Sequence, residues 1–258
     1  MIAEPMDSES EANPVKPSST PNARLPIIAI DGPAGAGKST VARHLARHFG
    51  LLNLETGAMY RAFALQAQEA GVSLEDVDAL LALSARTTIH LQAKPDGNRV
   101  LLDGRDVTSQ LREPSVTDGA SRVSVHSQIR AWMVGLQQEL GAAGGVVMEG
   151  RDIGTVVFPN ADVKIFLDAA PEVRGLRRYD QMEPNAAAEV QPEEVVRELR
   201  ARDERDRNRT DSPLKAAADA VLLDSTHMSL EEVVARAEAI VAGKLGIKNL
   251  PAAQFKSQ

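Results

Sequence analysis

The sequence predicts an α/β fold, a doubly wound parallel β-sheet with helices on both faces. Two observations support this prediction. Short apolar runs of the kind that form buried strands alternate along the chain with long segments of helical pattern. A glycine-rich turn directly follows the first apolar run and leads into the first helical segment. Helices must cover the sheet, because parallel strands need a crossover connection between them.

The composition fits a globular enzyme and excludes several other classes. The chain has 258 residues, of which 43% are hydrophobic and 25% are charged, and it has no cysteine. Disulfides, thiolate metal sites and a cysteine nucleophile are therefore excluded. The formal net charge of −7 has the wrong sign for a general binder of nucleic acid or anionic membranes. Any bound anion therefore needs a local basic cluster.

Neither a membrane span nor a secretory signal is expected. No apolar stretch approaches the ~18 residues of a span, and the N-terminus starts with acidic residues and has no apolar core. We expect a soluble, cytoplasmic monomer that has neither a nucleic-acid polymer nor a membrane as a partner.

The two ends of the chain have the composition of unstructured segments. Residues 1–24 are rich in Pro, Ser, Glu and Asn and have almost no large apolar residues, so burial cannot offset the entropy of ordering them. We expect disorder there, with a partner-binding tail as the alternative. We also expect a flexible C-terminus at 251–258, which leaves a folded domain at 25–250.

The strands and the first helix follow from apolar patterning. The first predicted strand is Ile27-Ile28-Ala29-Ile30, which is short and mostly β-branched. Helical pattern begins at Lys38, with Val41, Leu45 and Phe49 as its buried stripe. Three further runs are predicted to be buried strands: Val146-Val147-Met148, Val163-Lys164-Ile165-Phe166-Leu167 and Ala220-Val221-Leu222-Leu223.

Two regions interrupt the alternation of strands and helices. Apolar runs at 87–91 and 99–102 flank a turn at 94–98 that contains Pro, Asp, Gly and Asn, which indicates a hairpin. We expect a small antiparallel β insert near 87–113. The highly charged stretch 178–211 contains two prolines, and we expect it to form a mobile helical excursion before the last strand.

The glycine-rich turn indicates the chemistry. Residues Gly32-Pro33-Ala34-Gly35-Ala36-Gly37-Lys38-Ser39 match the phosphate-loop pattern G-x-x-x-x-G-K-[ST] without a mismatch, and Thr40 follows them. Backbone N–H groups of such a P-loop surround a phosphate, Lys38 would reach the β- and γ-phosphates of ATP, and the Ser39 hydroxyl suits Mg²⁺. The alternative is an ordinary glycine-rich turn, which the strand before it and the helix after it disfavour.

The P-loop alone leaves the reaction open, because GTPases, motor ATPases and small-molecule kinases share it. The sequence has no Asn-Lys-x-Asp signature of guanine binding. A motor ATPase usually has Asp-Glu at the end of an apolar strand, whereas Glu149 and Asp168 stand as single acids. Both alternatives are weakened, and a kinase is favoured.

A stripe of arginines supports a kinase. Arg202, Arg205, Asp206 and Arg209 are spaced i, i+3, i+4 and i+7 and would share one helix face. Three arginines on one face repel each other unless an anion neutralises them. We interpret this helix as a lid that closes over nucleotides and brings guanidiniums to the transferring phosphoryl group. The alternative is a solvated helix with internal ion pairs.

Two other segments carry arginines near predicted strand ends. Arg61 lies about one turn after Gly57, in a helix for which Thr56 is the expected N-cap, and could bind an acceptor phosphate bidentately. A capped surface helix explains this segment equally well. Arg151 and Asp152 follow a predicted central strand, at the edge where parallel sheets bind ligands. A turn with a surface ion pair is the alternative there.

These segments together resemble the bacterial cytidylate kinases, a family of nucleoside monophosphate kinases. The resemblance covers roughly 26–245, in the family's order and spacing, and rests on segments 30–40, 56–61, 150–159, 205–209, 218–220 and 223–226. The β insert also fits this family rather than the adenylate kinases. Two positions depart from the family pattern, because Glu55 stands where Asp is common and Ser39 where some members have Gly.

The resemblance implies roles that spacing alone does not assign. It implies catalytic roles for Lys38, Arg202, Arg205 and Arg209, and CMP contacts from Thr56, Gly57, Arg61, Ser121, Arg130, Arg151, Asp152, Asp206 and Arg209. Within that set, Arg61, Arg151 and Arg209 would hold the acceptor phosphate. Ser121, Arg130 and Asp152 would read the cytosine edge, and Asp206 would contact the sugar.

The implied activity is transfer of the γ-phosphoryl group of ATP to CMP or dCMP, giving ADP and CDP or dCDP, with Mg²⁺ as cofactor. The acceptor is already an anion and needs no catalytic base, so in-line positioning and charge stabilisation would carry the reaction. Asp31 and Glu149 are candidates for orienting metal-bound water. Two alternatives stay open: a P-loop kinase of another monophosphate such as UMP, and a nucleotide-switched binding protein.

The resemblance also implies how the chain is divided. A core would comprise 25–55, 141–177 and 213–250. An acceptor-binding region with the β insert would span 56–140, and a lid would span 178–212.

Overall fold

A five-stranded parallel sheet forms the centre of the protein. The computed structural model describes residues 24–94, 97–182 and 190–247, so the predictions for 1–23 and 251–258 lie outside the described residues. The strand order is β2-β6-β1-β7-β8, and every pairing is parallel. The strands are β1 (Ile27–Asp31), β2 (Leu52–Glu55), β6 (Val146–Gly150), β7 (Val163–Asp168) and β8 (Val221–Asp224). The predicted fold class is confirmed.

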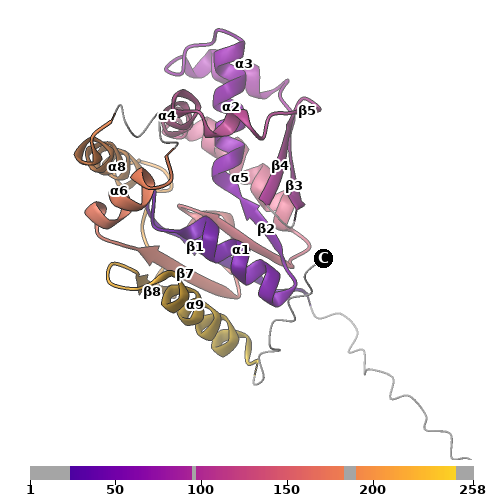
Figure 1. Ribbon diagram of the computed structural model, residues 1–258. Helices are drawn as coiled ribbons and strands as arrows, with labels where there is room; N and C mark the ends of the chain where they lie inside the picture. Colours follow the sequence, from indigo (N-terminus) through magenta and orange to yellow (C-terminus); the bar gives the residue numbers. More distant parts are fainter. Residues whose placement is uncertain (1–23, 95–96, 183–189, 248–258) are drawn as a thin grey trace, which may run out of the picture.

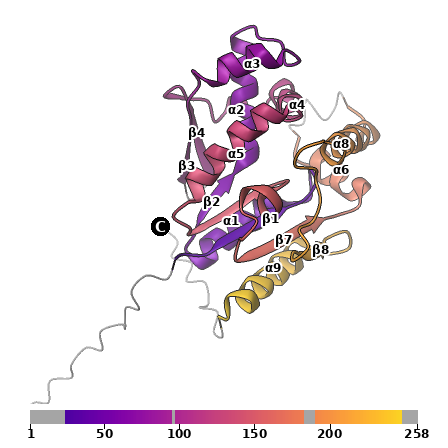
Figure 2. The same cartoon turned by 180° about the vertical axis from the view of Figure 1, so that it is seen from behind.

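Alternate residues of β1 point into two separate cores, as a strand buried on both faces requires. Ile28 and Ile30 pack with α1 (Lys38–Phe49) and α9 (Leu230–Leu245), which lie side by side in Figure 1. Ile27 and Ala29 pack with α2 (Thr56–Glu69) and α5 (Ser127–Gly141) on the other face, seen from behind in Figure 2. The sheet is therefore covered on both sides.

The predicted β insert is present and packs on α2. It is a three-stranded antiparallel sheet of β3 (Ile89–Lys94), β4 (Gly97–Leu102) and β5 (Arg105–Asp106). The same region also contains α3 (Val77–Ser84), the 3₁₀ turn η1 (Gln110–Arg112) and α4 (Pro114–Val123). Helix α4 packs against α2. The region rises above the carboxyl ends of the central strands in Figure 1.

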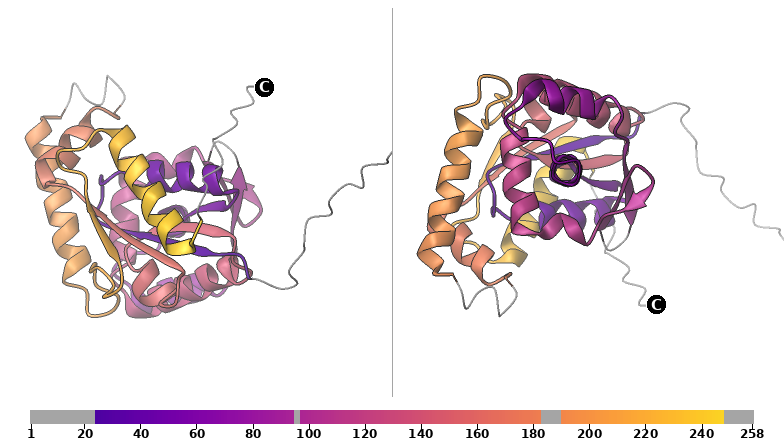
Figure 3. Two further views of the ribbon diagram at one scale, coloured as in Figure 1. Left: turned by 90° about the horizontal axis from the view of Figure 1, so that it is seen from below. Right: turned by 90° about the horizontal axis from the view of Figure 1, so that it is seen from above.

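Helix α8 (Pro192–Arg207) lies within the charged stretch and packs against α6 (Pro171–Tyr179), most of which precedes that stretch. In both views of Figure 3, α6 and α8 lie at the left of the molecule, apart from α2 and α5. Residues 183–189 between them lie outside the described residues. The helical part of the predicted excursion is therefore observed in α8, whereas its mobility and its role as a lid stay predictions.

Three local predictions need correction. Strand β2 was not predicted, because it is a short edge strand with an exposed residue, Leu52. The last strand is not buried: β8 is the other edge, and Leu222 is 69% exposed while Leu223 is buried. Thr56 does not cap α2. It is the first helical residue after Glu55, and its hydroxyl donates to the Glu149 carbonyl at 2.9 Å.

No helix among the described residues is both long enough and apolar enough to cross a membrane.

Candidate active site

The P-loop connects the end of β1 to the start of α1. Gly32 has φ of 149°, and a Cβ placed there would lie 1.9 Å from the Leu167 carbonyl oxygen of β7. Only glycine lets the loop pass so close to the neighbouring strand. Gly37, with φ of 95°, stands at the N-cap of α1, where no side chain accepts from the first-turn amides. These amides are available to an anion.

Lys38, Ser39 and Glu149 form one contact group at the start of α1. The Lys38 ammonium is buried, donates to the Pro33 carbonyl at 2.8 Å and lies 4.0 Å from the Glu149 carboxylate. The Ser39 hydroxyl donates to the other oxygen of Glu149 at 2.6 Å. Burial, followed by repulsion from Arg151, lowers the pKa of Lys38 to about 7. An anionic ligand would restore the charge of this lysine.

Asp31 holds the turn that follows β6. Its carboxylate accepts from the backbone N–H groups of Ile153 and Gly154 at 2.8 and 2.7 Å, at the start of the π-helical turn η2 (Ile153–Val157). Burial nevertheless raises the pKa of Asp31 to about 7. Of the two acids considered for metal-bound water, Asp31 is therefore engaged with backbone amides, whereas Glu149 contacts the Ser39 hydroxyl.

Arginines from three segments lie close enough together to repel one another, and two of them, Arg151 and Arg202, also repel Lys38 of the P-loop. Arg61 comes from α2, Arg151 from the end of β6 and Arg202 from α8. Burial, followed by repulsion from Arg151 and Arg61, lowers the pKa of Arg202 to about 9. Burial likewise lowers the pKa of Arg61, with repulsion from Arg151 contributing. The fold brings these positive charges close together although they are far apart in the chain.

Two of these guanidiniums have no carboxylate partner. Within residues 24–94, 97–182 and 190–247, neither Arg61 nor Arg202 forms a salt bridge, and the Nε atom of each is buried without a hydrogen-bond partner. A half-buried, unpaired cation is costly unless an anion accompanies it. This pair is the strongest indication of an anion site in the protein.

The other arginines of the predicted site are held by acids. Arg151 donates to Asp206 at 2.8 Å, and the buried Arg209 side chain pairs with the other oxygen of Asp206. Helix α8 ends at Arg207, so Arg209 lies just beyond it and not on the predicted helix face, yet its side chain still reaches Asp206. Arg205 is at the edge of the group. It is exposed and lies 3.5 Å from Asp118 of α4.

The three residues implied for base recognition, Ser121, Arg130 and Asp152, are all buried polar side chains. Arg130 donates to Asp152 at 2.5 Å, and both side chains are buried. The Ser121 hydroxyl is also buried and has no hydrogen-bond partner. Thr56 lies at the start of α2, and a Cβ on Gly57 would be 3.6 Å from the Arg61 guanidinium. The predicted residues therefore form separate contact groups: Lys38 and Ser39 with Glu149, Arg151 and Arg209 with Asp206, and Arg130 with Asp152.

Sequence reasoning missed two parts of this region. The Arg130 guanidinium carbon lies 5.6 Å from the centre of the Tyr60 ring, and the Tyr60 hydroxyl is buried without a partner. Arg174 is 1% exposed and donates to the carbonyls of Ala34 and Ala169, while its other nitrogen lies 2.6 Å from Asp203 of α8. Arg174 therefore connects the P-loop to α8. In the sequence it is one arginine among several in a charged helix, and no pattern distinguishes it.

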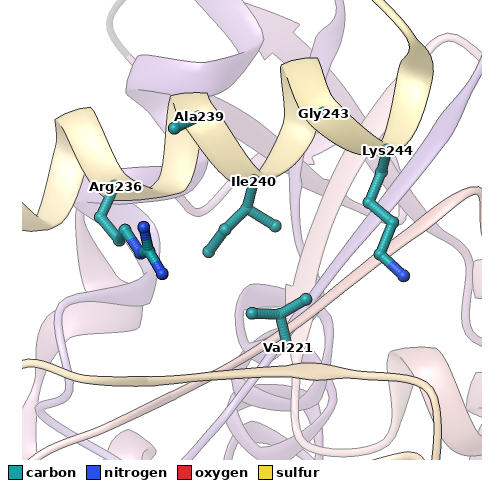
Figure 4. A pocket seen from close by; sticks show the side chains of 6 residues that line it. All are labelled: Val221, Arg236, Ala239, Ile240, Gly243 and Lys244. Atoms are coloured by element: carbon teal, nitrogen blue, oxygen red, sulfur yellow. The ribbon is translucent and has the colours of Figure 1, made fainter.

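A separate hollow lies between β8 and α9 (Figure 4). It is lined by Val221, Arg236, Ala239, Ile240, Gly243 and Lys244. Val221 is at the amino end of β8, whereas the P-loop is at the carboxyl ends of the strands. Parallel sheets bind their ligands at the carboxyl ends, so this hollow is not part of the candidate active site.

Comparisons with known proteins show what this chain is similar to. A family model described as cytidylate kinase matches residues 28–242. The chain is 46% identical to a cytidylate kinase of Syntrophotalea carbinolica, covering 84% of this chain and 92% of that protein. It is 48% identical to a cytidylate kinase of Pelotomaculum thermopropionicum, covering 81% and 93%. Among solved structures, a shikimate kinase from Acinetobacter baumannii is 19% identical with a TM-score of 0.40, over 87% and 95% of the two chains.

Proposed function

The chain belongs to the cytidylate kinase family, and on that premise we propose that the site around Lys38 transfers the γ-phosphoryl group of ATP to CMP or dCMP. The observation that carries this proposal is the pair of guanidiniums without a carboxylate partner, Arg61 and Arg202, whose positive charges repel each other near the P-loop. The Arg61 and Arg202 guanidiniums would lie where the phosphates of the two bound nucleotides meet. The family does not favour a nucleotide-switched binding protein.

On the donor side, ATP would occupy the P-loop. Backbone N–H groups of residues 32–40 other than Pro33 would surround its phosphates, and Lys38 would turn from the Pro33 carbonyl to the phosphate oxygens. Arg202 of α8 would neutralise charge on the transferring group. Arg205 would join it if the exposed contact with Asp118 gave way when the nucleotide binds.

On the acceptor side, Arg61, Arg151 and Arg209 would hold the phosphate of CMP. Asp206 now pairs with both Arg151 and Arg209. A sugar hydroxyl could donate to this carboxylate while the phosphate takes over part of the guanidinium contacts. Because the acceptor phosphate is anionic near neutral pH, the site needs no general base, and positioning would supply most of the rate.

Base choice would rest on Ser121, Arg130 and Asp152. Asp152 can accept from the cytosine amino group, while Arg130 and the unpartnered Ser121 hydroxyl can donate to O2 and N3. Uracil presents a carbonyl in place of the amino group, so an acceptor would face the Asp152 carboxylate with no proton between the two oxygens, although Arg130 still pairs with Asp152. Such mismatches give strong discrimination.

The residues beside Lys38 fit Mg²⁺. Ser39 and Glu149 present a hydroxyl and a carboxylate 2.6 Å apart, and hard oxygen ligands of this kind suit Mg²⁺. We propose that Ser39 would ligate the ion and that Glu149 would orient its water. When bound, the ion would neutralise charge on the β- and γ-phosphates.

A coupled ADP-release assay with ATP, Mg²⁺ and each nucleoside monophosphate tests this proposal. CMP and dCMP should stimulate ADP release far more than UMP, AMP or GMP. The variant Arg202→Met should lower kcat with CMP by about 10²–10³-fold. The matched control is Arg197→Met on the same helix, where the side chain is 73% exposed and, among the described residues, pairs only with Glu194; it should keep normal turnover. Equal stimulation by every monophosphate, or equal kcat in both variants, would contradict the proposal.

The domain division, the cytoplasmic location and the monomeric state that the sequence predicts stay predictions.

A further inference from the structure

Three metal-ligating side chains converge between α1 and α9, away from the candidate active site. His44 Nε2 lies 2.6 Å from the Glu238 Oε1 atom, and His48 Nδ1 lies 2.9 Å from the same oxygen. All three ligand atoms are within 4.8 Å of one another. The two imidazoles are stacked, with ring centres 6.0 Å apart. Nothing in the phosphoryl-transfer mechanism uses these residues.

The spacing of the two histidines is that of a metal-binding helix. His44 and His48 are at i and i+4 on α1, which places both rings on one face. The same spacing presents two histidines to zinc in the H-E-x-x-H helix of metalloproteases. The third ligand, Glu238, comes from the neighbouring helix. Two imidazoles and one carboxylate form a ligand set that suits zinc and other transition metals, whereas Mg²⁺ prefers oxygen alone.

The geometry needs only small movements to accept an ion. Ligands of one tetrahedral zinc ion lie about 3.3 Å apart when the metal–ligand distances are about 2.0–2.1 Å. The two histidine–carboxylate separations are slightly shorter than this, as expected for hydrogen bonds that an ion would replace. Solvent reaches the cluster, because the His44 and Glu238 side chains are 35% and 20% exposed. A fourth coordination position could be filled by water.

We propose that His44, His48 and Glu238 form a binding site for a divalent transition-metal ion, with zinc as the best match. The ion would join α1 to α9. Along α1 the two histidines are roughly 9 and 15 Å from Lys38, so the ion would stabilise the helix that carries the P-loop without contacting either nucleotide. In the part of the chain that the structure describes, this is the one cluster of three such ligands.

Metal binding to the full-length protein tests the proposal. Metal-free protein is titrated with Zn²⁺ against a chromophoric chelator, and with Co²⁺ while visible absorption is recorded. We expect one ion per chain and an intense Co²⁺ spectrum of the kind that four-coordinate sites give. The variants His48→Gln and Glu238→Gln should each lower the zinc affinity by at least about tenfold, since even outer-shell partners of a metal contribute that much. The matched control is His90→Gln, which replaces an exposed histidine of β3 and should bind as the natural chain does.

A thermal shift separates metal binding from packing. Zinc should raise the Tm of the natural chain and of His90→Gln, because an ion that binds only the folded state stabilises it, and it should not raise the Tm of His48→Gln. Where the partly buried His48 cannot be replaced without unfolding, His44→Gln at the more exposed position serves instead. Absence of one-to-one binding, or equal zinc affinity in the natural chain and every ligand variant, would overturn the proposal. The three side chains would then be a hydrogen-bonded cluster only.

Discussion

The P-loop and the arginine cluster, which consists of Arg61, Arg151, Arg202 and Arg209, both prepare the protein for phosphate, but they do so in different ways. The P-loop is one contiguous segment whose backbone amides and buried lysine are fixed by packing between β1, β7 and α1. The arginine cluster is assembled from α2, the end of β6 and α8 with the residues just after it. Two of its arginines, Arg151 and Arg209, are held in place by ion pairs with Asp206. Arg174 connects the two regions, because it contacts both the Ala34 carbonyl and Asp203. A contiguous motif such as the P-loop therefore sets its own geometry, whereas arginines from separate segments must be held in place by other residues.

The largest expected effect comes from breaking that connection. Asp203→Asn would leave the fully buried Arg174 guanidinium without its charged partner, and we expect a loss of roughly 3–5 kcal/mol in the free energy of unfolding, measured by urea titration. Glu172→Gln is the matched control. It breaks the contact between Glu172 and Arg200, which joins the same two helices, but both side chains are 58% exposed. It should cost less than about 1 kcal/mol. Equal losses in the free energy of unfolding of both variants would show that the buried contact of Arg174 with Asp203 contributes no more than an exposed ion pair.

Lys38→Met tests the P-loop by itself. It should lower kcat by about 10²–10³-fold, because a charge aimed at the transferring phosphoryl group is lost. The same change should leave the Tm unchanged or raise it, because burial already disfavours the charged lysine, whose pKa is lowered to about 7. Activity and stability would then move independently at this position. A fall in Tm that parallels the fall in kcat would mean that Lys38 is a structural residue.

The two regions also differ in how far the sequence could predict them. The P-loop pattern is contiguous, so its residues, the strand before it and the helix after it could be placed directly. The roles of Ser121 and Arg130 came only from the family resemblance, because a polar helix face has no local signature. Arg174 was missed because its importance arises from burial against Ala34, Ala169 and Asp203. Tertiary contacts of this kind are invisible to spacing.

Asp152→Asn tests whether Asp152 takes part in recognition of the base. An amide at this position can donate to the uracil carbonyl, so the ratio of kcat/KM for CMP to that for UMP should fall by about tenfold or more, as expected when one buried hydrogen bond worth about 1–3 kcal/mol is exchanged. The ratio is the useful readout, because any loss of stability from unpairing Arg130 affects both substrates equally. Asp118→Asn, at an exposed position of α4 that is 54% exposed, should leave the ratio unchanged. An unchanged ratio in Asp152→Asn would remove this residue from base recognition.

The smallest effect is a proton exchanged when ATP binds. In the free protein the pKa of Lys38 is lowered to about 7, so at pH 8 this group is mostly neutral. A bound phosphate favours the ammonium and raises its pKa, so binding should take up a fraction of one proton at pH 8 and almost none at pH 6, where Lys38 is already charged. Calorimetry in two buffers of different ionisation enthalpy measures this uptake. The uptake should disappear in Lys38→Met. If it persists there undiminished, the proton enters another group, and the P-loop lysine is charged before the nucleotide arrives.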